Sequence, residues 1–271
     1  MALLEVRLFW LAFWTYLGAT ILYALHIGLR KERLSQGGLA VIALGFCAHT
    51  AALILRISET SRLPVTNLYE YCSLFAWLIV LCLPVVQLKL KLPSVGALVA
   101  PIALMLMVIA SLLPKEPEQQ LLPALQSYWL TIHVSLAVIG EAVFAFAFAA
   151  SLMYLVIAGR AEAGGADSRT TKLDRLDEVS YKAITLGYPL FTVGALFAGA
   201  VWAQRAWGTP WSWDPKEVSS LIVWLVYSAY LHSCYVRNWK GRRAAWLSVI
   251  GFVTVIFTML GNLFMGGLHA Y

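Results

Sequence analysis

The sequence predicts an all-α integral membrane protein, a bundle of about eight transmembrane helices. Two features of composition support this class: 61% of the 271 residues are hydrophobic, and only 13% are charged. A soluble domain carries about 25% charged residues, so this chain has too few of them to cover a water-exposed surface. The third observation is that the apolar residues form long runs, each near or above the ~20 residues that span a bilayer as a helix.

The expected elements are eight apolar runs in chain order. Their approximate bounds are 8–29, 38–55, 68–87, 94–113, 128–158, 183–204, 218–236 and 245–266. The first run is followed by "IGLRKERL" without a small-residue cleavage site, so we interpret it as a retained helix rather than a signal peptide. No connection is long enough to fold alone, and residues 1–271 are predicted to form a single polytopic membrane domain.

The basic residues predict the orientation. If the N-terminus lies outside, 14 of the 20 Lys and Arg fall in inner connections and six in outer ones. Lys and Arg favour the cytoplasmic side of a membrane, so both termini and the connection 202–217 are expected on the outer side. This asymmetry accounts for the net charge of +6 without a nucleic-acid partner.

Two other features limit the choice of function. The longest inner connection, residues 159–182, contains "KLDRLDEV", which is expected to form a short interfacial helix with Leu173 and Leu176 on one side. The four cysteines lie in or beside apolar runs without a Cys-x-x-Cys pair. Neither thioredoxin-type redox chemistry nor a zinc site is therefore indicated.

The outer connection 202–217 contains "WGTPWSWDPKE", with three tryptophans in seven positions. A single tryptophan at a membrane interface is explained by its amphipathic ring. Three in one loop, shaped by a glycine and two prolines, favour a flat aromatic surface that binds a planar ligand, and Arg205 and Lys216 can pair with acidic groups of such a ligand. The candidate binding residues here are Trp207, Gly208, Trp211, Trp213, Asp214 and Pro215.

The histidines suggest what that ligand is, because metal-binding side chains inside a bilayer are costly and therefore functional candidates. His133 lies near the outer end of the fifth run and His269 just past the outer end of the eighth, both level with the tryptophan loop. His232 lies 15 residues after Glu217, roughly 22 Å along a helix, near the inner face. Two imidazoles beside an aromatic surface suit axial ligation of haem iron, and Trp129, one turn before His133, offers a further packing surface.

Three more polar residues allow two interpretations each. His49 and Glu141 are expected either to be structural or to line a path for haem. His26 lies near the inner level of His232, so a pairing of these two histidines is an alternative for the inner site.

The stretch "AVWAQRAWGTPWSWDPKEVSSLIVWLVYSAYLH" resembles the tryptophan-rich signature of haem-handling membrane proteins of cytochrome c biogenesis, most of all the CcsA (ResC) family. "LPVTNLYEY" (63–71) resembles an outer-loop motif of that family. "LPALQSYWLTIHVSL" (122–136) and "GNLFMGGLHAY" (261–271) resemble the segments that carry its two external histidines. The resemblance extends from about residue 40 to the end of the chain.

This resemblance implies that His133 and His269 are the axial ligands of haem b at an outer site. It also implies that His232 ligates haem at an inner site, where the other ligand belongs to a CcsB (ResB) partner. Four residues are expected to brace the outer loops around the site: Asn67, Tyr69, Glu70 and Glu217.

The implied function is that of the membrane subunit of a cytochrome c synthase. Haem would cross the membrane and be presented for thioether attachment to the CXXCH motif of apocytochrome c. This haem lyase activity is expected together with the CcsB partner and a thiol-reducing protein, in the bacterial cytoplasmic membrane or the thylakoid membrane. No acid, base or nucleophile is required of this chain, whose contribution is orientation.

Three alternatives remain open. A CcmC-type protein that delivers haem to a chaperone uses the same tryptophan motif, but that family is expected to be shorter, with fewer helices. A b-type electron-transfer subunit needs facing histidine pairs at two depths, and this sequence has one clear pair. A haem exporter without ligase activity differs from a synthase because it leaves apocytochrome c unmodified.

Overall fold

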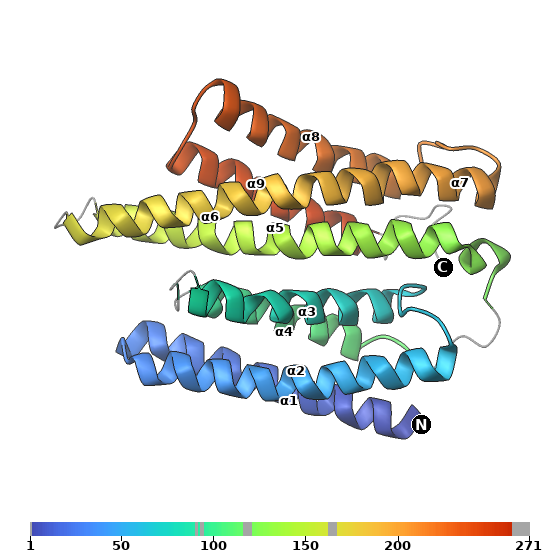
Figure 1. Ribbon diagram of the computed structural model, residues 1–271, viewed down its shortest axis with the longest axis horizontal. Helices are drawn as coiled ribbons and strands as arrows, with labels where there is room; N and C mark the ends of the chain where they lie inside the picture. The colour runs from blue at the N-terminus through green and yellow to red at the C-terminus, as the bar shows by residue number, and fades with distance from the viewer. Residues whose placement is uncertain (1, 90–91, 93–94, 116–120, 162–166, 262–271) are drawn as a thin grey trace. The chain divides into compact units, whose positions relative to one another are not determined.

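The computed structural model describes the chain apart from residues 1, 90–91, 93–94, 116–120, 162–166 and 262–271 (Figure 1). Every regular element in the described part is helical, which confirms the predicted all-α class. Within the predicted single membrane domain, contacts between helices define two compact units, Met1–Leu121 and Leu122–Tyr271.

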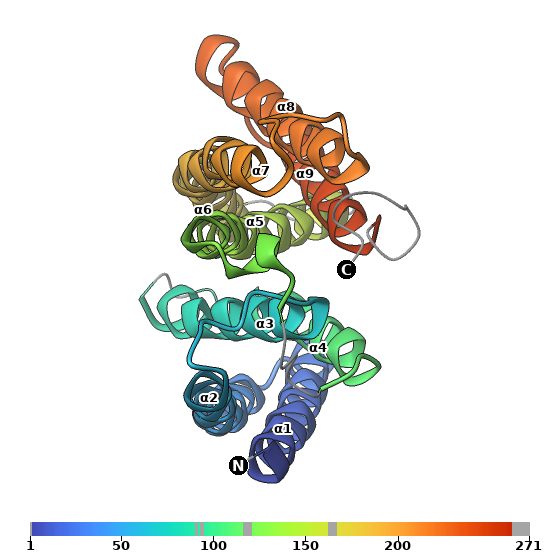
Figure 2. The ribbon, with the colours of Figure 1, turned by 90° about the vertical axis from the view of Figure 1, so that its right-hand side faces the viewer.

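Among its described residues, the first unit contains four helices and a π-helical turn: α1 (Ala2–Leu29), α2 (Glu32–Thr60), α3 (Leu68–Pro84), η1 (Val85–Lys89) and α4 (Gly96–Ser111). α1 packs along α2, α3 packs against α4, and α4 also contacts α1 (Figure 2). The turn η1 follows directly on Pro84, which lacks the N–H that a regular helix needs at that position.

The second unit contains the remaining elements: the 3₁₀ turn η3 (Pro123–Gln126), α5 (Tyr128–Ala161), α6 (Asp167–Phe191), the π-helical turn η4 (Thr192–Ala198), α7 (Gly199–Trp207), α8 (Pro215–Val236) and α9 (Arg242–Gly261). α6, η4 and α7 follow one another without a break. α5 packs along α6, α8 packs against α9, and α9 returns to contact α5 (Figure 1).

Seven helices in the described part are long and apolar enough to cross a membrane, so the chain is a multi-pass membrane protein. The predicted fourth run, 94–113, forms α4, which has 16 residues and is shorter than the ~20 needed for a straight crossing. The predicted sixth run, 183–204, belongs to a longer candidate span of 37 residues, Thr171–Trp207. The described part of the chain thus contains seven candidate spans and one shorter apolar helix, α4, and the count of eight crossings stays a prediction.

The expected interfacial helix within residues 159–182 is not a separate element. Residues from Asp167 onward belong to α6, which continues into η4 and α7. Leu176 is fully buried, and the side chain of Asp177 accepts a hydrogen bond from the backbone N–H of Gly241 at 3.0 Å. These contacts hold the segment against the rest of its unit. The pattern of charged and apolar residues in "KLDRLDEV" does not predict them, because they involve residues distant in the sequence.

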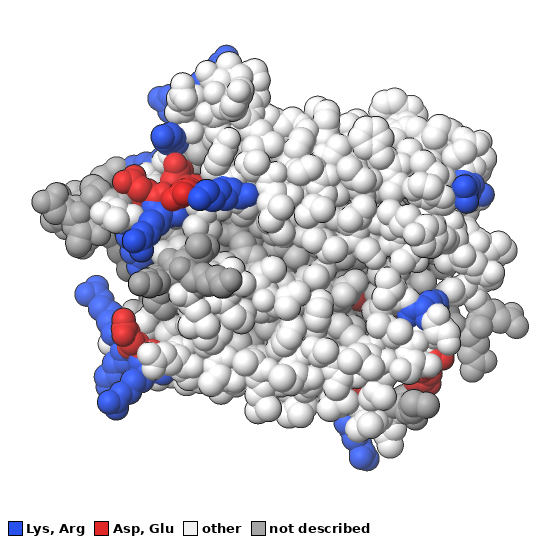
Figure 3. Space-filling model, viewed as in Figure 1, with Lys and Arg blue, Asp and Glu red and all other residues white. Residues whose placement is uncertain are grey.

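Charged side chains lie near the helix ends on the face seen in Figure 3, while uncharged side chains cover the middles of the helices. The exposed side chains of those middle segments include large apolar ones, such as Leu44 in α2 and Val253 in α9. An apolar middle with charged ends is what a helix spanning a bilayer requires.

Candidate functional site

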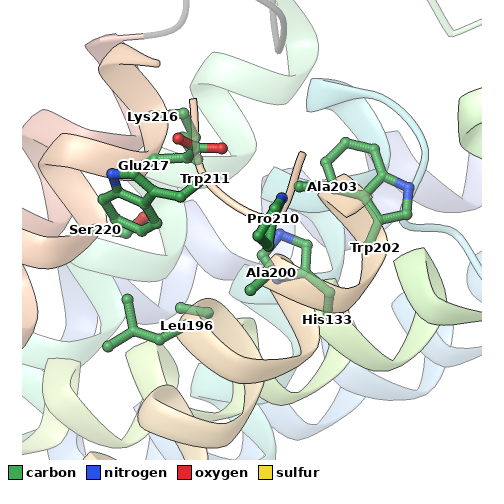
Figure 4. Close-up of a pocket in the computed structure, with 12 residues that line it drawn as sticks. His133, Leu196, Ala200, Trp202, Ala203, Pro210, Trp211, Lys216, Glu217 and Ser220 are labelled. Atoms are coloured by element: carbon green, nitrogen blue, oxygen red, sulfur yellow. The ribbon is translucent and has the colours of Figure 1, made fainter. Parts of the chain in front are cut away.

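A pocket in the second unit lies where the tryptophan connection meets α5 (Figure 4). The space between its lining side chains is about 360 Å³, a volume that includes the part open to solvent. His133 and Trp202 lie on one side of Pro210, and Trp211 and Glu217 lie on the other. The predicted site residues His133, Trp211 and Glu217 therefore line one cavity.

The imidazole of His133 is held in a defined orientation. Its Nδ1–H donates a hydrogen bond to the backbone carbonyl of Gly194, at 2.9 Å. Its ring lies parallel to the indole of Trp202, with ring centroids 5.8 Å apart and an interplanar angle of 6°. Because a carbonyl can only accept, Nδ1 carries the proton, and in the neutral ring Nε2 carries the lone pair. Nε2 is therefore the nitrogen of His133 suited to bind iron.

Trp202 is a site residue that the sequence reasoning did not single out. It is 1% exposed, and its Nε1–H donates to the carbonyl of Ala124 at 2.9 Å. This bond ties α7 to the 3₁₀ turn η3, just before the start of α5. A signal was present: Trp202 belongs to the stretch that resembles the family signature, five positions before Trp207.

The tryptophan connection is shorter than the predicted 202–217. α7 continues to Trp207, and α8 begins directly after Asp214, so the non-helical part is 208–214. Gly208 ends α7 in the left-handed conformation (φ 81°), which glycine adopts without the strain that a side chain would add. Residues 202–207 and 215–217 of the predicted range are helical, because the residues that end α7 and begin α8, Gly208 and Asp214, both lie inside that range.

A capping box closes the other end of the connection. Asp214 accepts a hydrogen bond from the N–H of Lys216 at 3.0 Å, and Glu217 Oε2 accepts from the N–H groups of Ser212 and Asp214 at 2.7 and 3.2 Å. These bonds satisfy N–H groups that have no partner within the helix. The other oxygen, Glu217 Oε1, is buried and has no hydrogen-bond partner in the described part of the chain.

The three tryptophans of the motif "WGTPWSWDPKE" do not form one flat surface. Trp211 lines the pocket, whereas Trp213 is 70% exposed and stands at 90° to it. Trp213 has a left-handed backbone (φ 58°), and its ring meets that of Trp211 edge to face, with the centroids 5.7 Å apart. Trp207, at the end of α7, packs edge to face on Trp202 at 5.8 Å.

Neither cation near the site is simply exposed to solvent. Lys216 lines the pocket and donates from Nζ to the carbonyl of Thr258 in α9, at 3.2 Å. The guanidinium of Arg205 lies over the ring of Trp129, 5.7 Å from its centroid. Trp129 is thus packed beneath a cation at the start of α5 and is not one of the pocket-lining residues.

His232 lies far from this pocket along the same helix. Lys216 and Glu217 occupy the first turn of α8, whereas His232 is exposed near its last turn. Glu141 is buried two turns further along α5 than His133. The structure therefore does not bring His232 to the tryptophan pocket, as expected for a residue of an inner site. His269 belongs to residues 262–271 and lies outside the described part of the chain.

The histidines of the first unit have structural partners. His49 is fully buried, with Nδ1 hydrogen-bonded to the hydroxyl of Tyr16 at 3.2 Å and Nε2 to the hydroxyl of Ser73 at 2.8 Å. It joins α1, α2 and α3, which favours the structural interpretation. His26 is buried and donates from Nδ1 to the carbonyl of Lys31 at 3.0 Å, closing the turn between α1 and α2.

The motif at 63–71 forms a buried ionic cluster in the first unit. Asn67 caps α3 by accepting from the N–H of Glu70 at 2.9 Å. Glu70 forms an ion pair with Arg56 at 2.9 Å, and Tyr69 donates to Glu5 at 3.1 Å. Asn67, Tyr69 and Glu70 thus join α1, α2 and α3 at the ends of these helices.

Relatives of the chain are known by sequence and by structure. The chain matches the family described as cytochrome C assembly protein over residues 65–269. The cytochrome c biogenesis protein CcsA of Guillardia theta is 34% identical over 96% of this chain and 94% of that protein, and CcsA of Gloeobacter violaceus is 32% identical with the same coverage. CcsA of Chlamydomonas reinhardtii is 38% identical over 81% of this chain and 64% of its own length.

Among solved structures, cytochrome c heme lyase CcmF matches 95% of this chain with a TM-score of 0.69. The two are 20% identical, and this chain corresponds to 46% of the longer CcmF chain. At this identity the likeness concerns the fold alone.

The fold and the pocket define the class: a multi-pass helical membrane protein with a histidine held beside an aromatic cavity. The chain belongs to the cytochrome c assembly protein family, among the relatives of CcsA. This confirms the family indicated by its tryptophan-rich stretch and assigns the chain a role in cytochrome c maturation.

Proposed function

We propose that the chain is the membrane subunit of a cytochrome c synthase, which presents haem b at its outer pocket for covalent attachment to apocytochrome c. The observation that carries this proposal is the placement of His133 in the pocket, with Nε2 as its lone-pair nitrogen and Trp202 stacked on its ring. Histidine nitrogens are common axial ligands of haem iron. His269 is the proposed second ligand.

The dimensions of the pocket suggest how haem is held. A space of about 360 Å³, part of it open, does not enclose a whole porphyrin, so haem is proposed to lie across its mouth. Trp211 then packs on the macrocycle, and the exposed Trp213 contributes a second aromatic contact or receives the apocytochrome. Lys216 and Arg205 are the cations that can pair with the propionates.

The attachment reaction needs orientation rather than an acid or a base. Each cysteine thiol of the CXXCH motif adds across one haem vinyl group: sulfur bonds to the α carbon, and the hydrogen goes to the β carbon. Atoms balance, and no electrons are exchanged with an outside donor. Fixing the vinyl groups beside the thiols is the contribution of the pocket, while a thiol-reducing protein keeps both cysteines reduced.

His232 is the proposed ligand of an inner haem site, with its other ligand on a CcsB-type partner. Its exposed position near the last turn of α8 leaves it accessible to a second membrane protein. Haem is proposed to pass from this site to the outer pocket.

The proposal is tested by purifying the chain together with a CcsB-type partner, as wild type and as His133→Ala, His269→Ala and His232→Ala. The wild type should show the sharp reduced α and β absorbance bands of bis-histidine haem. Either outer substitution should shift or remove these bands, and His232→Ala should lose a separate, partner-dependent fraction. A haem-free wild type in the presence of the partner would refute haem ligation by this chain.

Covalent attachment is tested in the same samples by adding apocytochrome c and haem and measuring haem that stays with the cytochrome after denaturation. A synthase attaches haem in this assay. Bound haem without attachment would instead indicate delivery to a chaperone or export.

A further inference from the structure

The π-helical turn η4 lies directly against His133. In a π-helix each carbonyl pairs with the N–H five residues later, and the carbonyl of Gly194 accepts from the N–H of Gly199 in this way. The same carbonyl accepts the Nδ1–H of His133 at 2.9 Å. The carbonyl of Gly194 therefore accepts two hydrogen bonds, one from the N–H of Gly199 and one from the imidazole of His133. π-Helical turns occur frequently at functional sites.

Two glycines allow this turn and the imidazole to approach each other. A side chain at Gly194 would place its Cβ 2.5 Å from the backbone nitrogen of Ala137 and 2.7 Å from the Cβ of Leu136, so η4 could not lie this close to α5. A Cβ at Gly199 would lie 3.0 Å from Nδ1 and 3.1 Å from Cε1 of His133. The absence of a side chain at Gly194 lets η4 approach α5, and its absence at Gly199 lets the imidazole keep its position without a shift of a few tenths of an ångström.

Trp202 completes the surroundings of the ring. Its indole lies parallel to the imidazole, and its own orientation is fixed by burial and by the hydrogen bond to Ala124. The hydrogen bond to the carbonyl of Gly194 thus restrains one edge of the imidazole, and the parallel indole of Trp202 restrains the orientation of its plane. The missing side chain of Gly199 leaves room for the ring.

We infer that Gly194, Gly199 and Trp202 form a seat for the imidazole of His133, which selects its Nδ1–H tautomer and directs Nε2 to the ligand. They are positioning residues, because they act on the ligand only through His133. The statement that this ligand is haem iron rests on the proposed function. Substitution of the residues that orient a metal-binding histidine commonly lowers metal affinity about 10–100-fold. We expect a loss of haem retention in the same range here.

The first test needs neither haem nor a substitution in the seat. Protein labelled with ¹⁵N-histidine is studied haem-free by two-bond ¹H–¹⁵N correlation NMR, which distinguishes the two tautomers of a neutral imidazole. The signal of His133 is assigned by its loss in His133→Ala. The seat requires the Nδ1–H tautomer for this residue, and an Nε2–H tautomer in the wild type would overturn the inference.

The second test compares Gly199→Ala and Trp202→Phe with Gly159→Ala, a control because no atom lies within 4 Å of a Cβ at Gly159. Gly199→Ala should give a mixture of tautomers and release haem to apomyoglobin about 10–100-fold faster, while Trp202→Phe, which keeps an aromatic face, should have a smaller effect. The control should match the wild type. Unchanged tautomer and haem release in Gly199→Ala would also overturn the inference.

Failure of the proposed function gives a different pattern. A wild type that binds no haem with its partner, yet shows the Nδ1–H tautomer that Gly199→Ala disturbs, would leave the seat in place and refute haem as its ligand. If Gly199→Ala does not fold, the wild-type tautomer and Trp202→Phe still decide the question.

Discussion

Trp202 and Trp213 are the same residue type in one short stretch, but they have opposite surroundings. Trp202 is 1% exposed, stacked on His133 and hydrogen-bonded to Ala124, whereas Trp213 is 70% exposed. At the scale of single residues, substitutions of the two should therefore affect different properties. Substitution of Trp202 should lower the stability of the second unit, and substitution of Trp213 should weaken the binding of the ligand at the pocket.

Trp202→Ala should lower the free energy of unfolding by about 3–5 kcal/mol, because it removes a large buried side chain and leaves a cavity. Trp213→Ala should change it by less than about 0.5 kcal/mol, as is usual for exposed sites, while still weakening haem binding. Unfolding in denaturant, followed by helix content in micelles, measures both values. Equal losses of stability for the two variants would contradict the distinction.

At the scale of elements, helix ends position the site. α8 begins with the capping box of Asp214 and Glu217, and this arrangement also holds the connection 208–214. The carboxylates of Asp214 and Glu217 accept hydrogen bonds from backbone N–H groups. This structural role explains the presence of both acidic residues without a catalytic one.

Asp214→Ala should cost about 1 kcal/mol of stability because it removes the N-cap acceptor. Asp214→Asn keeps an equally favourable cap and should retain both stability and cytochrome c maturation. Thermal unfolding and a haem stain of matured cytochrome check the two readouts. Loss of maturation in a fully stable Asp214→Asn would show that the negative charge itself is required.

The ionic cluster at the start of α3 is the corresponding element of the first unit. Arg56 is 1% exposed and pairs with Glu70 and Glu5. Arg56→Ala should destabilise the first unit by about 3–5 kcal/mol, since it leaves the buried carboxylate of Glu5 without its counter-ion and leaves Glu70 paired with Arg62 alone. The exposed pair of Lys182 and Glu178 is the control, because Lys182→Ala should cost less than about 1 kcal/mol. A similar cost at both sites would mean that Arg56 is better hydrated than its burial indicates.

At the scale of the whole molecule, the distribution of basic residues predicts which helix ends face outward. In a cysteine-free background, Gln204→Cys places a thiol in the last turn of α7, before the tryptophan connection, and Asn238→Cys places one just after the end of α8. A membrane-impermeant maleimide added to intact cells should label Gln204→Cys, and it should label Asn238→Cys only after permeabilisation. The reverse pattern would place the tryptophan pocket on the cytoplasmic side and refute an outer attachment site.

Much of the fold followed from local properties of the sequence. The length and apolarity of the runs predicted helical spans, and only α4, at 16 residues, fell short of a predicted crossing. Segments whose character depends on distant contacts were less predictable. The charge pattern at the start of α6 predicts a separate interfacial helix, because nothing nearby in the sequence indicates the burial of Leu176 or the hydrogen bond between Asp177 and Gly241.

The sequence by itself determined the class of protein, the position of the tryptophan connection, His133 as a candidate ligand and the family, because hydrophobic length, residue type and motif spacing are local properties of a chain. Only the tertiary structure decided how that histidine is held. The carbonyl of Gly194 lies 61 residues from His133 in the sequence, and the direction of each tryptophan depends on backbone angles such as the left-handed φ of Trp213. Contacts between distant segments and the orientation of rings arise from packing, and a linear pattern does not encode them in a readable form.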